Sequence, residues 1–141
     1  MPDWPAPAGV RAVMTTRNGG YSTGPFDSFN LGDHVGDDLR NVTQNRILLR
    51  DRLELKAEPL WLRQVHGCAV AGCSSGDGPA EADASVTTTP GKPCVVLTAD
   101  CLPILLCNQS GSRVAAIHAG WRGLAAGVIE AAIDRFDDAG E

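Results

Sequence analysis

The fold class of this 141-residue chain follows from two neighbouring stretches, Cys94-Val-Val-Leu-Thr-Ala-Asp-Cys-Leu-Pro-Ile-Leu-Leu-Cys107 and Arg113-Val-Ala-Ala-Ile117. The first holds two apolar runs, 94–98 and 102–107, and a hairpin-type turn over 109–112 leads into the second. Continuous apolar runs are typical of strands that are covered on both faces. Strand, turn, strand, hairpin, strand and a following helix predict a mixed α/β domain (α+β type) layered around a large mixed β-sheet.

Two further strands are predicted upstream of this core. A turn-rich stretch over 72–79 separates them from residues 82–89. Residues 60–65 fit a short strand that ends at His66, and residues 10–16 resemble a strand that runs into the turn Arg17-Asn-Gly-Gly20.

Two helices are predicted. The first begins at Asn41, with Gln44 as its capping-box partner, and continues to about Leu55 before Pro59. The second begins near Arg122, and its apolar side chains fall on one face of a 3.6-residue period. That stripe comprises Leu124, Val128, Ile129, Ala132, Ile133 and Phe136.

Composition limits the function classes. With 43% apolar and 21% charged residues the chain is typical of a globular protein, and its net charge of −5 argues against a nucleic-acid-binding surface. Apolar runs stay short of the ~20 residues that span a membrane, and the first residues lack a signal-peptide pattern. The five cysteines are an odd number, which predicts free thiols in a reducing compartment. We therefore expect a cytoplasmic protein without membrane or nucleic-acid partners.

Three residues are candidate metal ligands: His66, Cys101 and His118. Each stands where an apolar run meets a turn. Two imidazoles and one thiolate suit Zn²⁺ and leave a fourth coordination position open, as in catalytic zinc sites. Their spacing matches no zinc-finger or ribbon pattern, and a histidine that merely caps a strand end is the alternative for His118.

Polar residues near these ligands suggest supporting roles. Asp100 can orient a ligand histidine, and Asp83 can orient a ligand or act as a general acid. Both aspartates can equally serve turn formation, since Asp side chains bond their own backbone readily. Arg122 lies where a helix begins after glycines, a setting that favours phosphate, although a surface guanidinium is the alternative. His34 is interpreted as a loop histidine.

Taken together in their order, seven blocks resemble the YfiH family, also called the multicopper polyphenol oxidase or laccase-domain family. The blocks are Thr16–Ser22, Phe29–Asp37, Asn45-Arg46, Trp61–Gly67, Glu81–Ala84, Thr98–Pro103 and His118–Gly123. The resemblance implies a layered α/β sandwich and a metal-dependent enzyme that phosphorolyses adenosine, inosine, guanosine and methylthioadenosine and also deaminates adenosine. Its partners would be purine nucleosides and phosphate.

The resemblance also implies roles for individual residues. Zinc, or copper as the alternative, would be bound by His66, Cys101 and His118. Catalytic roles fall to Cys101, His66, Asp83 and Asp100. Phosphate would be held by Arg17 or Arg122.

One departure from the family concerns length. Family members continue into further C-terminal blocks, so we expect a single domain over residues 1–141 that is incomplete at its C-terminal end, with weak or absent catalysis. An uncovered apolar stripe on the last helix would then support self-association. Two alternatives remain: a copper-dependent polyphenol oxidase, which the count of three histidines disfavours, and a non-catalytic metal-binding fragment.

Overall fold

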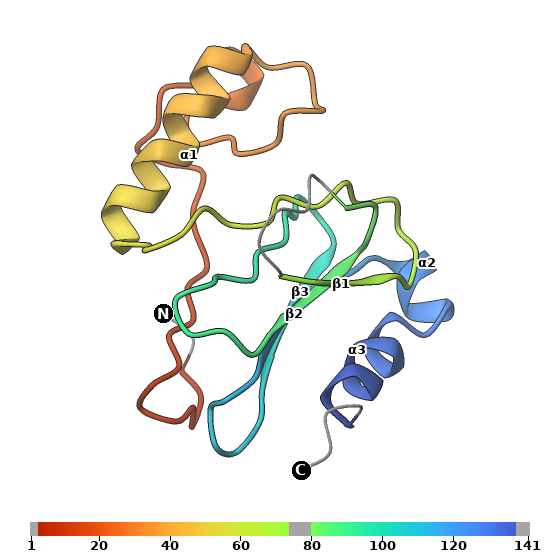
Figure 1. The fold of residues 1–141 in the computed structure, drawn as a ribbon. Coiled ribbons are helices and arrows are strands. Elements are labelled where there is room, and N and C mark those ends of the chain that lie inside the picture. Colours follow the sequence, from red (N-terminus) through yellow and green to blue (C-terminus); the bar gives the residue numbers. More distant parts are fainter. Residues whose placement is uncertain (1–2, 74–79, 138–141) are drawn as a thin grey trace. The chain divides into compact units, whose positions relative to one another are not determined.

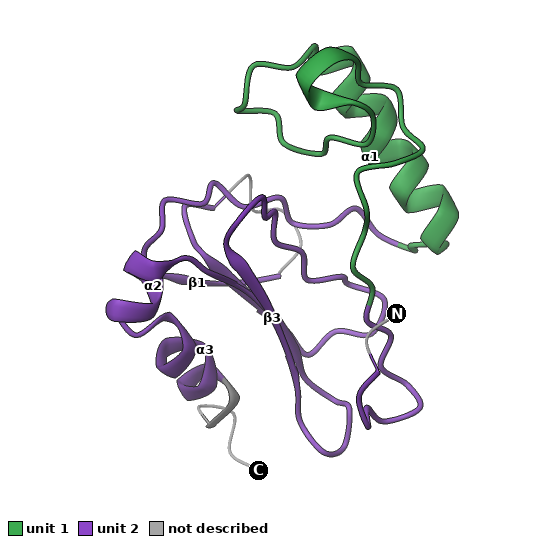
Figure 2. Cartoon of the chain, turned by 180° about the vertical axis from the view of Figure 1, so that it is seen from behind, with its two compact units in different colours: residues 1–2, 13–56 green, residues 3–12, 57–141 purple. Residues whose placement is uncertain are grey.

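The structure, a computed structural model, describes residues 3–73 and 80–137 (Figure 1). Its contacts divide the described chain into two compact units, residues 13–56 (unit 1) and residues 3–12, 57–73 and 80–137 (unit 2), coloured separately in Figure 2. Among the described residues, no helix has the length and apolarity needed to cross a membrane. One domain over the whole chain remains a prediction.

Unit 1 is built on α1 (Leu39–Leu53), preceded by the short 3-10 helix η1 (Gly24–Phe26). The predicted helix is confirmed, but its start at Asn41 is wrong. Asp38 is the N-cap, because its carboxylate accepts a hydrogen bond from the backbone N–H of Arg40. The helix ends at Leu53, well before Pro59. Its C-cap residue, Glu54, adopts the left-handed conformation with φ 53°.

The loop of unit 1 is held to α1 by Asn45, which is fully buried. Its Nδ2 donates to Ser22 Oγ at 2.9 Å and to the Asn30 carbonyl at 2.8 Å, while its Oδ1 accepts from the Tyr21 N–H at 2.8 Å. Asp37 extends this network. Hydrogen bonds from the Ser22 hydroxyl and then the Asn30 amide hold the pKa of the Asp37 carboxyl below its ordinary value. Residues of the blocks 16–22, 29–37 and 45–46 therefore hold this loop together by hydrogen bonds.

Unit 2 contains a four-stranded mixed sheet with the strand order β1-β2-β4-β3. The strands are β1 (Val70–Gly72), β2 (Ala84–Thr87), β3 (Leu102–Cys107) and β4 (Val114–Ala119). Strands β1 and β2 pair in parallel, and β2–β4 and β3–β4 pair antiparallel. The mixed α/β fold class is confirmed, and the hairpin places Pro103 opposite His118.

One face of this sheet is covered by the last helix, which the structure divides into α2 (Trp121–Ala125) and α3 (Val128–Asp137). Gly127, with φ +86°, separates them. The core beneath α3 comprises Ala84, Ile117, Val128 and Ala132. The predicted stripe is only partly buried, since Leu124 and Ile133 are 39% and 44% exposed. The side chain of Phe136 lies outside the described residues.

Three strand predictions need correction. Residues 10–16 form no strand within the described part of the chain, and Val13 and Met14 are exposed. Residues 60–65 contribute only one isolated bridge, from Arg63 to Glu81. Residues 94–98 are partly buried, which accounts for their apolar side chains, but they are not part of any strand. An apolar sequence pattern predicts that a segment is buried. A strand requires in addition a neighbouring backbone whose N–H and C=O groups are free to pair with it.

Candidate metal centre

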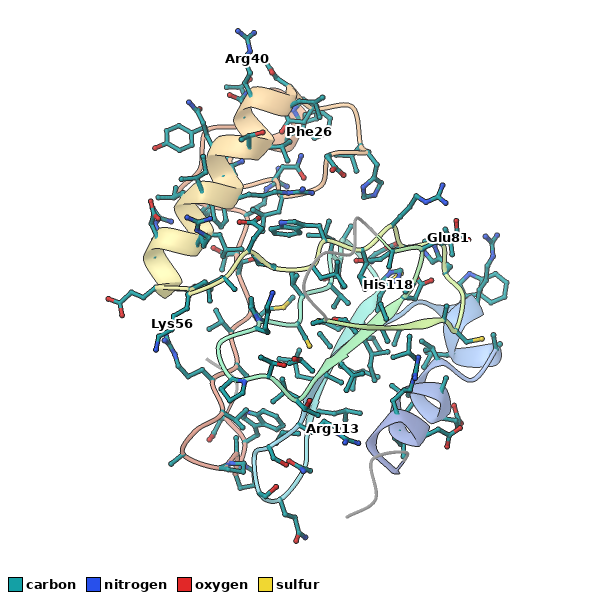
Figure 3. The ribbon with its side chains drawn as sticks, viewed as in Figure 1. Phe26, Arg40, Lys56, Glu81, Arg113 and His118 are labelled. Atoms are coloured by element: carbon teal, nitrogen blue, oxygen red, sulfur yellow. The ribbon has the colours of Figure 1, made fainter. Side chains whose placement is uncertain are left out.

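The candidate site forms where β4 ends, and His118 is the most buried of its three candidate ligands. Figure 3 shows Arg113 and His118 at opposite ends of β4. The side chain of His118 is 4% exposed, and its Nδ1 lies 2.8 Å from Asp83 Oδ1. A carboxylate can only accept, so Nδ1 carries a proton, and Nε2 is the ring nitrogen left to bind a metal. This is the tautomer that a metal-binding imidazole needs.

Asp83 organises both imidazoles. It is fully buried just before β2, and its two oxygens accept hydrogen bonds from the backbone N–H groups of Val65 (3.2 Å), His66 (2.8 Å) and Gly67 (2.7 Å) as well as from His118. Burial acts to raise the pKa of the Asp83 carboxyl, but these hydrogen bonds outweigh it and leave the pKa below its ordinary value. A carboxylate already engaged by four donors favours the orienting role over that of a general acid.

His66 sits at the tip of the turn that Asp83 holds. Its backbone is in the left-handed region with φ 61°, a conformation that costs energy for a non-glycine residue and needs support. That support comes from Asp83 and from Gln64, whose side-chain amide exchanges two 2.7 Å hydrogen bonds with the backbone of Leu97. The His66 ring meets the His118 ring edge to face, with centroids 4.8 Å apart.

Cys101 enters the site from the residue before β3. Its Sγ lies 3.8 Å from His66 Nε2 and 3.8 Å from Asp100 Oδ1. Partial burial, followed by the negative charge and hydrogen bond of Asp100 and the charge of Asp83, raises the pKa of the Cys101 thiol. The negative potential that disfavours a thiolate is the potential that favours a cation.

Gly120 is a site residue that ligand chemistry alone did not identify. A Cβ built on Gly120 would lie 2.8 Å from His66 Cδ2 and 3.1 Å from Cys101 Sγ. Nearby, a Cβ on Gly123 would lie 2.9 Å from the Gly67 carbonyl oxygen. In the sequence, the two glycines that follow His118 indicated only the start of a helix. They did not indicate that His66, Cys101 and the Gly67 carbonyl pack against them.

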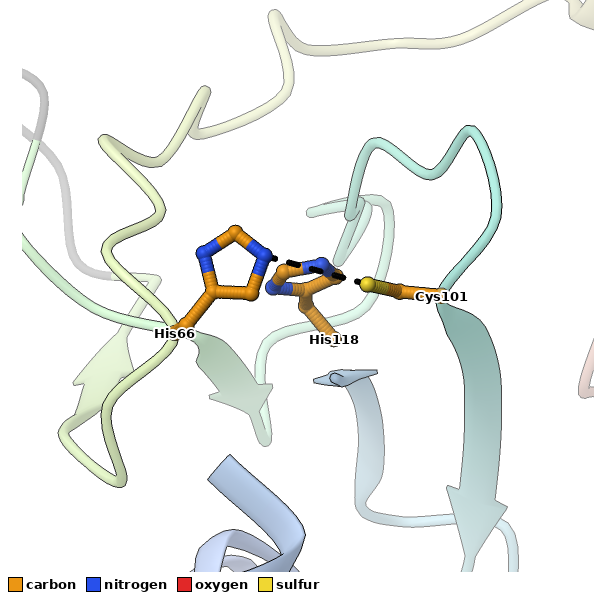
Figure 4. A group of neighbouring side chains, drawn as sticks. All are labelled: His66, Cys101 and His118. Carbon is orange, nitrogen blue, oxygen red and sulfur yellow. Dashed lines mark hydrogen bonds between the residues drawn. The ribbon is translucent and has the colours of Figure 1, made fainter. Parts of the chain in front are cut away.

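The three candidate ligands are brought together as predicted. Their ligand atoms all lie within 4.8 Å of one another (Figure 4). Zinc with bonds of about 2.0–2.3 Å holds tetrahedral donors about 3.3–3.8 Å apart, so small side-chain shifts would close the cluster on an ion. The described residues contain no other such group of three potential ligands.

Each of the remaining candidate residues has its own local contacts. The Arg122 guanidinium is exposed on α2 and stacks over the Trp121 ring at 5.2 Å. Arg17 belongs to unit 1, where its guanidinium donates to the carbonyls of Asp27 and Pro25. His34 is exposed in unit 1 beside Asp33, at 3.7 Å, consistent with a loop histidine. Phosphate binding by either arginine remains a prediction.

Comparison with known proteins now identifies the family. Residues 11–141 match the model of a family described as multi-copper polyphenol oxidoreductase laccase. The chain belongs to this family. This chain is 56% identical over 140 residues to a protein of Pseudomonas aeruginosa named purine nucleoside phosphorylase PA4543, a match that covers 99% of this chain and 57% of that relative.

A second relative and a solved structure are also similar to this chain. The Escherichia coli protein named purine nucleoside phosphorylase YfiH is 50% identical over 139 residues, covering 98% of this chain and 57% of its own length. The crystal structure of Neisseria meningitidis protein NMB0706 superposes with a TM-score of 0.88 at 47% identity, covering 94% of this chain and 55% of that one. The chain thus spans little more than half the length of the relatives it matches.

Proposed function

We propose that this chain carries the metal centre of a zinc-dependent purine nucleoside phosphorylase that also deaminates adenosine and acts in the cytoplasm. The observation that carries the proposal is the cluster of His66, Cys101 and His118, with the His118 tautomer fixed by a buried carboxylate. The names of the relatives support the substrate class. Adenosine, inosine, guanosine and methylthioadenosine would be the nucleosides, with inorganic phosphate as the second substrate.

The donor set fits zinc. Two imidazole nitrogens and one thiolate leave an open position, and zinc accepts this N/S mixture readily. When bound there, the ion would supply Lewis-acid polarisation in a site otherwise built from side chains. Asp83 would position both imidazoles through His118 Nδ1 and the His66 N–H.

Proton movement at the site would involve Cys101 and Asp100. The thiol must lose its proton to bind a cation, and Asp100 Oδ1 at 3.8 Å is placed to accept it. Because Asp100 is exposed, it can exchange that proton with solvent. Phosphate would be held by Arg122 or Arg17, so that its oxygen replaces the purine nitrogen at the sugar's anomeric carbon.

The proposal is tested by metal content and turnover together. Purified protein should contain about one zinc per chain, as expected for a single three-ligand site. With phosphate, inosine should yield hypoxanthine and ribose 1-phosphate, and adenosine without phosphate should yield inosine. Cys101→Ala should lose both zinc and turnover, while Cys68→Ala, which changes an exposed thiol next to the same turn, should lose neither. Zinc-loaded protein with no nucleoside turnover would refute the enzymatic role of this chain.

A copper-dependent phenol oxidase is the second candidate, favoured by the description of the family and by the soft thiolate ligand. Multicopper oxidation needs many histidine ligands, yet the chain has three histidines and the cluster already contains two of them. Oxygen-dependent oxidation of a phenol by the copper-loaded protein, without nucleoside turnover, would favour this candidate.

A further inference from the structure

A second pair of thiols lies in unit 2 apart from the metal centre. Cys73 follows β1 directly, and its backbone N–H donates to the Val86 carbonyl at 2.9 Å, so it continues the β1–β2 pairing. Cys94 lies in the extended segment that precedes β3, and its thiol contacts the Val114 carbonyl at 3.7 Å. The two sulfur atoms are 3.6 Å apart.

Both thiols lie on the sheet face opposite α3. Successive side chains of a strand point to opposite faces, and Ala84 and Ile117 point into the core beneath α3. Ser85, the next residue of β2, therefore points away from α3, and it acts to lower the pKa of both thiols. Val70 packs against the α3 core, so Cys73, three positions later, points to the Ser85 side as well.

The surroundings give the two sulfurs different chemistry. The hydrogen bond between the two thiols lowers the pKa of Cys73 to about 7, against the effect of burial and with help from Ser85 and the positive charge of Lys92. The same hydrogen bond, together with burial, raises the pKa of Cys94. Cys73 is thus the more acidic thiol of the pair and its nucleophile.

We propose that Cys73 and Cys94 form a redox-active dithiol that closes to a disulfide when a peroxide reaches it. The Cys73 thiolate attacks one oxygen of hydrogen peroxide, the O–O bond breaks, and hydroxide leaves. The Cys94 sulfur then attacks the sulfenic acid at Cys73, forming the S–S bond as the thiol proton and the sulfenic hydroxyl leave as water. The hydroxide takes up the proton that the Cys73 thiol had released, so two thiols are oxidised and one peroxide is reduced to two waters.

Closure requires a small movement. The sulfurs must approach by about 1.5 Å to reach the disulfide bond length, a distance within the range of side-chain rotation. The bond would join the end of β1 to the segment that runs through Leu97, already held by Gln64, into Cys101. Oxidation would therefore link the residue after β1 covalently to the segment that leads to Cys101.

Peptide mapping of the wild-type chain tests the proposal. Asp-N protease cleaves before aspartate, so it places Cys68 and Cys73 on peptide 51–76, Cys94 on peptide 83–99, and Cys101 with Cys107 on peptide 100–133. Folded protein is treated with a few equivalents of hydrogen peroxide, quenched with N-ethylmaleimide in acid and digested. We expect peptides 51–76 and 83–99 joined, with the mass of two hydrogens lost, and separated again by dithiothreitol.

Two variants make the assignment specific. Cys68→Ser should leave the joined peptide intact, which identifies Cys73 as the partner, whereas Cys94→Ser should leave Cys73 as a sulfenic acid that dimedone labels. In the oxidised wild type the thermal midpoint should rise and return on reduction, because the crosslink restricts the unfolded chain. Cys94 that remains fully labelled by N-ethylmaleimide after peroxide, or that is joined to peptide 100–133, would overturn the proposal in the wild-type protein itself.

Discussion

A single methyl group at Gly120 should disable the metal centre without unfolding the protein. Gly120 has φ −71° and ψ 158°, an extended conformation that alanine adopts freely, so Gly120→Ala introduces no backbone strain. The effect of the substitution must therefore come from the space that the new Cβ occupies.

The magnitude follows from two distances. The Cβ would lie 2.8 Å from His66 Cδ2 and 3.1 Å from Cys101 Sγ, both candidate ligands. Non-bonded carbons prefer at least ~3.5 Å, so the His66 ring would have to retreat by about 0.7 Å. Metal–ligand bonds tolerate shifts of about 0.2 Å, so the displacement is several times too large. We expect zinc affinity to fall on the order of 10- to 100-fold, the range seen when the support of metal ligands is disturbed.

The assay is competition for zinc against a fluorescent chelator, with circular dichroism to show that both proteins are folded. The matched control is Gly72→Ala, because a Cβ on Gly72 meets nothing within 4 Å in the same sheet. A zinc dissociation constant for Gly120→Ala equal to that of the wild type and of Gly72→Ala would refute the steric reasoning and the assignment of the cluster.

Four further outcomes are expected. Asp83→Asn should lower the free energy of unfolding, measured by urea denaturation, by about 2–4 kcal/mol. Each Asp83 oxygen accepts two hydrogen bonds, so whichever oxygen the amide nitrogen replaces, two N–H donors lose their acceptor. A loss under about 1 kcal/mol would contradict this. Cys101→Ala should lose most of its zinc by elemental analysis, and equal zinc in Cys68→Ala and Cys101→Ala would speak against thiolate ligation. Asp37→Asn should destabilise the protein at pH 7, because the hydrogen bonds that Asp37 accepts stabilise only the carboxylate. The stability difference between wild type and variant should shrink as the pH falls below the unfolded carboxyl pKa of 3.8 and through the lower folded value. A stability difference that is constant from pH 7 to 2.5 would show that the charge is irrelevant. Ile133→Lys should reduce any concentration-dependent association seen by sedimentation, since Ile133 is 44% exposed on α3, and an unchanged association constant would exclude that face.

The sequence predicted the clustering of the three candidate ligands better than it predicted the strands, and the reason is physical. Ligand types are chosen by metal chemistry, so His66, Cys101 and His118 could be singled out wherever apolar runs end. Strands β3 and β4 were also predictable, because a turn joins two apolar runs that pair with each other. Residues 10–16 carry a similar pattern, yet form no ladder with any described strand.

The parts that escaped prediction depend on contacts between distant residues. Asp83 could be named as an orienting group or a turn former, but only the folded chain shows that one carboxylate meets three successive N–H groups and a ring. Gly120 escaped for the same reason, since nothing in its own neighbourhood reveals the approach of His66. The proximity of Cys73 and Cys94 likewise depends on how a segment without strand pairing crosses the sheet.

The four hydrogen bonds at Asp83 have a consequence for how the centre assembles. One carboxylate holds both the backbone that carries His66 and the ring of His118, so both imidazoles are anchored to the same group. Cys101, the residue before β3, lies outside these hydrogen bonds and is the movable arm of the site. Capture of an ion should then proceed as a one-step closure of that arm onto a preset imidazole pair, with a rate set by removal of the thiol proton.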